Sequence, residues 1–215
     1  GKFEAQRASA VKECQREMYK IFIAENIPSL NKGEMTILEG MLESFKILGE
    51  VNVSMLSARP EIDTPRYISK LKVINIDESW PSKGGLNSGP TSKVLISIEI
   101  MLQHLAFVIL YKTFKPIALR FFKSEIWKEY LKADVIIVGH NGSFGLRGGL
   151  GIPYFYLLYL PLFAKMLGKA VVLYGGSVGP FRQSHKFLWR GARFVLSQVH
   201  LITLRENVSC QNLKD

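Results

Sequence analysis

The sequence predicts an α/β fold, a three-layer domain built on a mostly parallel sheet of about six strands. Residues 135–139 and 170–176 are unbroken runs of apolar or small side chains, without the alternation of a half-exposed strand. Such runs are typical of strands that are covered on both faces. Segments of this kind alternate along the chain with segments of helical periodicity, which indicates parallel strands joined by helices.

The composition is that of one globular domain. The chain has 215 residues, of which 47% are hydrophobic and 21% charged, which suits a single domain with a substantial core. Its net charge of +10 favours acidic partners, such as phosphorylated metabolites, nucleic acid or an anionic membrane surface. Charge alone does not choose among them.

The cysteines and the first residues limit the classes of protein to which the chain can belong. Cys14 and Cys210 form no CxxC pair or Cys/His cluster, so neither a zinc site nor a disulfide framework is indicated, and no metal is expected. Residues 1–20 are charged throughout and lack the apolar core of a signal peptide, which favours a cytoplasmic protein. We expect residues 1–20 to be a charged segment or helix and residues 21–215 to form the domain.

The domain is expected to begin with a strand, a helix and a second strand. Residues 21–24 form an apolar run, and Asn31 with Glu34 makes the pair typical of a capped helix start. Apolar residues recur at helical spacing after it, and Gly49 stands where this helix should end. Residues 51–56 are expected to form the second strand.

The next segments lead from a turn to a long helix. Residues 57–65 are expected to form turns after the second strand, and residues 71–76 a third strand. Residues 80–90 are rich in Gly, Ser and Pro, which predicts a mobile loop. A long apolar helix is expected over residues 91–114, and Pro116 should mark its end.

Residues 94–111 are the one segment that could be taken for a membrane span. Glu99, Gln103 and His104 lie near its middle, and each is costly in hydrocarbon. We interpret these three residues as one polar stripe at helical spacing. The segment is therefore expected to be a buried or surface-lying helix rather than a span.

Helices and strands continue to alternate over the second half of the chain. Residues 122–131 show helical spacing of apolar residues, and Pro153 suits the first turn of a helix over residues 154–167. Pro161 should kink that helix and Gly168 should end it. The elements expected after it are a strand at 170–176, a helix capped by Ser184 that runs to Leu196, a strand at 201–206 and the start of a helix at 207–215.

Residues able to bind a ligand gather at four strand ends. In a parallel sheet the carboxyl ends of the strands lie at one edge, where open α/β sheets bind ligands. Turns and helix starts at that edge present backbone N–H groups to phosphates or carboxylates, although the glycines could equally be turn residues only. The segments are 25–26 with 31–33, 139–145, 175–180 and 205–206, and the residues expected to bind substrate are Asn26, Asn31, Gly33, Gly139, Asn141, Gly142, Ser177, Gly179 and Arg205.

Two familiar phosphate-binding motifs are missing from these loops. The glycines of residues 139–145 do not have the spacing GxGxxG, and the pattern GxxxxGK[ST] is absent from the sequence. The sequence therefore disfavours NAD-dependent and P-loop chemistry.

Arg205 and His140 are the side chains best suited to chemistry. Arg205 closes the apolar strand expected at 201–206, where an unpaired arginine would be costly. It either binds a carboxylate or phosphate, or forms an ion pair with Glu206 or Glu25. His140 lies in the loop after the buried strand, where it is either a general acid or base or an ordinary hydrogen-bonding residue.

A basic helix follows the 175–180 turn. Lys186, Arg190 and Arg193 recur along one side of it, with Arg182 just before. They form either a patch for an anionic substrate or lipid headgroups, or a solvated helix face. Binding of nucleic acid is not indicated.

Four motifs taken together resemble one known family. They are IAENIPSLNKGEMTILEGML (residues 23–42), ADVIIVGHNGSFG (133–145), LFAKMLGKAVVLYGGSVGPF (162–181) and VHLITLRENVSCQNLK (199–214). A strand that enters a Gly-rich loop, a Ser-x-Gly-Pro-Phe turn, and a strand that closes on Arg-Glu with a serine three residues later are similar to the polysaccharide pyruvyl transferase family.

The resemblance implies a fold and a reaction. The fold would be a Rossmann-like N-terminal domain, one half of a GT-B-like architecture with the active site between two domains. Phosphoenolpyruvate (PEP) would be the donor and co-substrate, with no other cofactor, and the acceptor would be a sugar or lipid-linked glycan of a cell-surface polymer. The product would be a pyruvate ketal that bridges two sugar hydroxyls, with phosphate released.

The resemblance also bears on single residues. Arg205 matches the motif and would bind the anion, while His140 and Glu206 are candidates for proton transfer from their chemistry alone. His140 and Asn141 interrupt the consecutive glycines that are usual in this loop. The family's C-terminal domain is absent from these 215 residues, so we expect the fragment alone to be inactive.

Two other functions fit the sequence. One is a GT-B glycosyltransferase that uses a nucleotide sugar. The other is a membrane-peripheral, non-catalytic binding domain that uses the 94–111 helix and the basic helix face.

Overall fold

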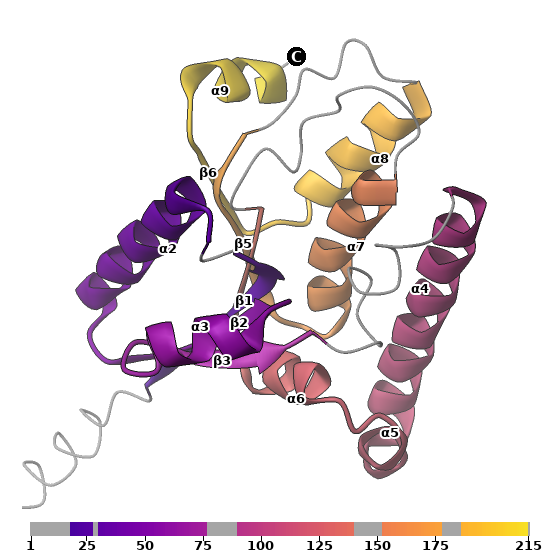
Figure 1. Cartoon of the computed structure of the whole chain (residues 1–215). Helices are drawn as coiled ribbons and strands as arrows, with labels where there is room; N and C mark the ends of the chain where they lie inside the picture. The colour runs from indigo at the N-terminus through magenta and orange to yellow at the C-terminus, as the bar shows by residue number, and fades with distance from the viewer. Residues whose placement is uncertain (1–17, 28–29, 77–89, 140–151, 178–185, 215) are drawn as a thin grey trace, which may run out of the picture.

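The computed structural model describes residues 18–27, 30–76, 90–139, 152–177 and 186–214 (Figure 1). In this part of the chain six strands form one parallel sheet in the order β3-β2-β1-β4-β5-β6. The α/β fold and the parallel sheet that the sequence predicts are confirmed. The strands are β1 (Tyr19–Asn26), β2 (Val51–Ser57), β3 (Lys72–Asn75), β4 (Val135–Val138), β5 (Ala170–Gly176) and β6 (Leu201–Leu204).

Helices cover both faces of the sheet, which gives the expected three layers (Figure 1). Helices α2 and α3 lie on one face, and α4, α6 and α7 on the other. The helices are α2 (Lys32–Phe45) with the 3-10 turn η1 (Lys46–Leu48), α3 (Pro60–Tyr67), α4 (Pro90–Thr113), α5 (Lys115–Phe121), α6 (Glu125–Lys132), α7 (Ile152–Met166), α8 (Lys186–Leu196) and α9 (Asn207–Lys214).

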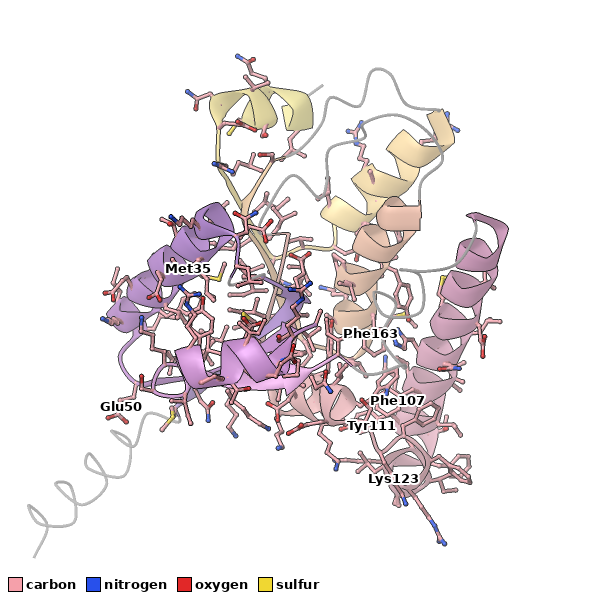
Figure 2. The ribbon with its side chains drawn as sticks, in the orientation of Figure 1. Met35, Glu50, Phe107, Tyr111, Lys123 and Phe163 are labelled. Carbon is pink, nitrogen blue, oxygen red and sulfur yellow. The ribbon has the colours of Figure 1, made fainter. Side chains whose placement is uncertain are left out.

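Two apolar clusters attach these helices to the sheet. On the α2 side the buried residues include Met41 and Tyr67. On the other side Trp127 of α6 packs its ring 4.3 Å from that of Phe107 and 5.3 Å from that of Phe163, measured between centroids. Figure 2 shows Phe107 on α4 and Phe163 on α7 in this layer. Such close aromatic packing holds α4, α6 and α7 together as one layer.

The prediction of turns at residues 57–65 is wrong, because helix α3 occupies most of this segment. Pro60 lies in the first turn of α3, where its missing N–H removes no helical bond. The Ser57 hydroxyl donates to the buried carboxylate of Asp63 and accepts the N–H of Arg59 at 2.9 Å. Tyr67, at the end of α3, is also buried. Tertiary contacts therefore stabilise a short helix that has little helical periodicity of its own.

The long helix ends close to Phe114, as expected, but a further helix begins at Lys115, just before Pro116. Helix α4 ends at Thr113, Phe114 has a φ of −137°, and Pro116 lies in the first turn of the next helix, α5. The proline thus begins a helix, the position in which a fixed φ and a missing N–H cost least. The sequence did not indicate α5.

Several expected helix ends are confirmed and others are not tested. Gly49 and Gly168 take the left-handed φ values of +89° and +75° that end α2–η1 and α7. The loop expected at 80–90 lies, up to residue 89, outside the described residues, as does Ser184. The kink at Pro161, which is inside α7, stays a prediction.

The polar stripe expected on the long helix is wrong for one of its three residues. Glu99 and Gln103 are exposed, and their side chains lie 3.4 Å apart (Gln103 Nε2 to Glu99 Oε1). His104 is instead fully buried, with its ring stacked 4.7 Å from that of Phe163. A residue five positions after another lies about 140° away around a helix, so His104 cannot share a face with Glu99. Within the described ranges, none of the helices has the length together with the apolar character that a membrane span requires.

The ion pairs of the buried Glu129 at the amino end of the sheet predict pH-dependent stability. The Glu129 carboxylate accepts from Lys72 Nζ at 2.9 Å and faces Lys132 Nζ at 3.5 Å. Burial raises the pKa of Glu129, but the hydrogen bonds and charges of the two lysines outweigh burial and leave this pKa below its usual value. A lowered pKa stabilises the fold above the unfolded-state pKa, and the stabilisation is lost as the pH falls through the folded-state pKa.

We therefore expect Glu129→Gln to lower the free energy of unfolding by about 1–2 kcal/mol at pH 7. The difference from the unsubstituted protein should shrink below a pH of about 4, as measured by urea unfolding at several pH values. Glu43→Gln is the matched control, because the Glu43–Lys46 pair is exposed and should contribute almost nothing. Equal effects of the two substitutions would contradict this account.

Candidate functional site

The sheet has a single point at which the strand order reverses. The chain leaves β1 towards β2 and β3 on one side, and leaves β4 towards β5 and β6 on the other. In open α/β sheets the crevice outside the carboxyl ends of the strands at such a point is the usual ligand site. The start of α2 and helix α9 lie at this edge (Figure 1). The predicted strand ends therefore do share one edge.

The ends of β4 and β5 touch through two glycines. Gly139 directly follows β4, is buried and has a φ of +81°. Gly176 is the last residue of β5, and a Cβ atom there would lie 2.4 Å from the Gly139 carbonyl oxygen and 2.7 Å from Leu173 Cδ2. Since the first of these neighbours is backbone, only glycine allows the two strand ends to approach so closely.

A bulge at the end of β5 directs the chain into the turn that follows. Gly175 has a φ of +62°, and the register with β6 shifts between Leu173 and Gly176. The Thr203 hydroxyl of β6 accepts the Gly175 N–H at 2.8 Å and donates to the Leu173 carbonyl at 3.3 Å. This side chain replaces ladder bonds that the bulge interrupts. Ser177, next in the chain, is half-buried.

Arg205 joins this edge through its backbone. It follows β6, and its N–H donates to the Gly176 carbonyl oxygen at 3.2 Å. The strand ends at Leu204 rather than at residue 206 as predicted, and the side chain of Arg205 is exposed. The argument that an unpaired arginine would be costly here is thus wrong. Within the described residues no ion pair joins Arg205 to Glu25 or Glu206.

Glu206 opens helix α9. Its carbonyl accepts from the N–H groups of Ser209 at 3.1 Å and Cys210 at 3.4 Å, and its carboxylate accepts from the Ser209 hydroxyl at 3.3 Å. These bonds explain the spacing of the Arg-Glu-x-x-Ser motif, because Ser209 in the first turn of the helix hydrogen-bonds to Glu206 just before it. Glu206 is itself exposed, and its role in proton transfer stays a prediction.

Asn26 and Asn31 flank the connection from β1 to α2. Asn26 is the last residue of β1. Asn31 is the N-cap of α2, where its side-chain oxygen accepts the N–H of Gly33 at 3.0 Å and of Glu34 at 3.4 Å, which confirms the predicted helix start. The positive end of the α2 dipole thus points to the edge that would bind an anion.

Substitutions of Asn31 separate its capping role from ligand binding. We expect Asn31→Ala to lower the free energy of unfolding by about 1 kcal/mol, because the cap is lost. Asn31→Asp keeps the cap, so stability in urea should be unchanged or higher, but its added negative charge should weaken use of an anionic substrate. Full use of that substrate by the Asp variant would exclude an anion near the start of α2.

Glu25 is a further residue of this edge that the sequence reasoning undervalued. It is the penultimate residue of β1 and is only 4% exposed. A carboxylate buried at the carboxyl end of a strand, beside the switch point, suits proton transfer or ligand binding. The signal was in the sequence: an acidic residue that directly follows the apolar run at 21–24.

The remaining predicted residues cannot be placed. His140, Asn141, Gly142 and Gly179 lie outside the described residues. The structure does bring Gly139, Gly176 with Ser177, and Arg205 to one place, with Asn26 and the start of α2 on neighbouring strand ends. In the described ranges no group of three or more His, Cys, Asp or Glu side chains is arranged to hold a metal ion.

A hollow of about 410 Å³ lies at the opposite, amino-terminal edge of the sheet. Its charged lining consists of Lys20, Lys72, Lys132 and Glu129. Glu129 is paired with two of these lysines, and Lys72 is also paired with Glu125, so carboxylates meet most of the lysine charge. This hollow has the features of a structural ion-pair network rather than of a ligand site.

Comparison with known proteins adds one match. A family model with the description Polysaccharide pyruvyl transferase matches residues 31–215. The matched part begins at the Asn31 cap and includes the ends of β4, β5 and β6. No curated protein matches the chain.

Proposed function

The chain belongs to the polysaccharide pyruvyl transferase family, and from this premise we propose that it helps to transfer pyruvate from PEP to a sugar of a cell-surface polysaccharide. In this proposal the carboxyl edge of the sheet forms one wall of the site. A sugar or a lipid-linked glycan is the acceptor, and PEP is a co-substrate without any other cofactor.

The junction of three strand ends is the observation that carries the proposal. Gly176 stands in the middle of this junction: its backbone lies against the Gly139 carbonyl, and its own carbonyl accepts the N–H of Arg205. The Arg205 backbone is thereby fixed while its guanidinium is exposed. A permanently charged and planar donor on a fixed backbone suits the carboxylate or the phosphate of PEP. The N-terminus of α2 offers a second anion-binding element at the same edge.

The reaction requires two proton transfers. One acceptor hydroxyl attacks C2 of PEP while the methylene carbon C3 takes a proton and becomes a methyl group. The second hydroxyl then attacks C2, the C2–O bond to phosphate breaks, and the ketal and inorganic phosphate result. Of the two hydroxyl protons lost, one balances the proton taken by C3 and the other leaves with phosphate.

Three residues are proposed to move these protons. His140 follows Gly139 in the sequence, and its imidazole can act as an acid or a base near neutral pH. Glu206 adjoins Arg205, and Glu25 is a buried carboxylate near the end of β1, the strand beside β4. A position at the same edge of the sheet as the arginine that binds the anion would let such groups reach the enolpyruvyl carbons or the acceptor hydroxyls.

The full-length protein tests the proposal directly. It is incubated with glycan acceptors and either PEP or nucleotide sugars, and phosphate release and product mass are measured. We expect a pyruvylated glycan only with PEP, and in D₂O the new methyl group should carry deuterium. Turnover with a nucleotide sugar alone would identify a glycosyltransferase instead.

A further inference from the structure

Helix α4 is apolar on two opposite faces. Its inner face buries His104, Phe107 and Val108. Its outer face carries Ile98, Leu102, Leu105 and Ile109, with exposed fractions of 39% to 57%. Because these four residues are spaced by four, three and four positions, they lie within about 60° of one another. The outer face of a helix in such a layer is usually polar. An exposed apolar stripe therefore indicates that another molecule binds there.

Helix α5, which lies at the end of α4 (Figure 1), adds further exposed apolar residues. Phe121 is 74% exposed, and Ala118 is the buried residue that attaches this helix to the core. The other large apolar residues exposed here are Phe114, Ile117 and Leu119. Together with the four residues of α4 they form what we call the α4–α5 surface. Exposed apolar side chains gathered on adjoining helices in this way mark an interaction site.

The flank of the α4–α5 surface is positively charged. Lys112, Lys115, Arg120 and Lys123 are all exposed, and Figure 2 shows Lys123 at the α5 end. Residues 100–124 contain no Asp or Glu. Just beyond them, the Glu125 carboxylate is 2.7 Å from Lys72 Nζ. The surface therefore combines apolar side chains with cations that have little local counter-charge.

We propose that the α4–α5 surface docks on an anionic lipid bilayer. The apolar stripe, Phe114 and Phe121 would enter the headgroup region. The long stems of the lysines and arginine would keep their charges at the lipid phosphates. A second copy of the chain fits less well, since a symmetric contact would bring four cations against four. Docking needs no PEP and does not depend on the proposed reaction.

The position of this surface agrees only in part with the one that the sequence suggested. The sequence pointed to the 94–111 helix, which lies in α4, but it took the cations from the basic face of the helix with Lys186, Arg190 and Arg193. The structure assigns the cations to the end of α4 and to α5, where they are next to exposed apolar residues. Basic and apolar residues in one place are what distinguishes a lipid-binding helix from a solvated one.

Co-sedimentation of the full-length protein with vesicles tests this proposal. Vesicles of phosphatidylcholine with phosphatidylglycerol should bind the protein at low salt, and vesicles of phosphatidylcholine alone should bind it weakly. Lys115→Glu with Lys123→Glu should lower the partition coefficient roughly tenfold or more. Leu102→Gln with Ile109→Gln should lower it as well, without a loss of thermal stability because both side chains are exposed.

Ile47→Gln with Ile68→Gln is the matched control. These two isoleucines are 88% and 77% exposed but belong to η1 and to the end of α3, away from the α4–α5 surface. The control should bind vesicles as the unsubstituted protein does. Equal binding by all variants, or no binding to anionic vesicles, would overturn the proposal. So would a dimer in light scattering that the Leu102/Ile109 variant abolishes, because a second copy would then cover the surface.

Discussion

Arg205→Ala is expected to lower kcat/KM for PEP in the full-length protein by roughly tenfold to a hundredfold, with unfolding in urea unchanged. A hydrogen bond to a charged group contributes about 1.5–3 kcal/mol, which corresponds to this range. The guanidinium is exposed, and the N–H bond to the Gly176 carbonyl does not involve the side chain. The loss should therefore appear in steady-state kinetics and not in stability.

Two variants control this result. Arg205→Lys keeps the charge but not the planar fork and should show an intermediate loss. Arg190→Ala removes another exposed arginine, on α8, and should leave the use of PEP unchanged. Lower stability with normal kinetics for Arg205→Ala would mean that the arginine has a structural role only.

Gly176→Ala is expected to damage fold and activity together. The added Cβ would meet the Gly139 carbonyl oxygen at 2.4 Å, so the ends of β4 and β5 must separate. We expect the free energy of unfolding to fall by about 2–3 kcal/mol. Pyruvyl transfer should fall further than this destabilisation explains, since the strand end that holds Ser177 and anchors Arg205 would shift. Urea unfolding and kinetics at a temperature where the variant is folded separate the two effects.

Gly40→Ala is the control for the chemistry of the substitution. Gly40 is exposed in the middle of α2, and an added Cβ would meet nothing within 4 Å. This variant should be more stable by about 0.5–1 kcal/mol, because alanine favours the helix. If Gly176→Ala were as stable as the unsubstituted protein, the close contact between the strand ends would not exist in solution.

The strands and helix caps could be predicted because their signals are local. The run 170–176 coincides with β5, and Asn31 caps α2 as its side chain and position indicated. Helix α3 could not be predicted, since it depends on the bond between Ser57 and the buried Asp63. This helix has only eight residues, two of them prolines, so its apolar residues show no recognisable helical spacing.

The site was only partly predictable, because strand order is not a local property. Glycines after two strands indicated a turn at each. That Gly139 and Gly176 touch follows from the pairing of β4 with β5, which no spacing in the sequence reveals. The sequence predicted the correct edge for Arg205, but for a wrong reason. The argument assumed an arginine inside the strand, whereas β6 ends at Leu204 and Arg205 is exposed.

Mapping where PEP binds tests the central claim most directly. NMR spectra of the isotope-labelled full-length protein are recorded with increasing PEP, and the backbone amide shifts are followed. The amides of Gly33, Gly139, Ser177 and Arg205 should shift together with a single dissociation constant, and Arg205→Ala should weaken that constant. Shifts confined to the hollow lined by Lys20, Lys72 and Lys132, or no saturable shifts in this chain, would contradict a PEP site at the carboxyl edge of the sheet.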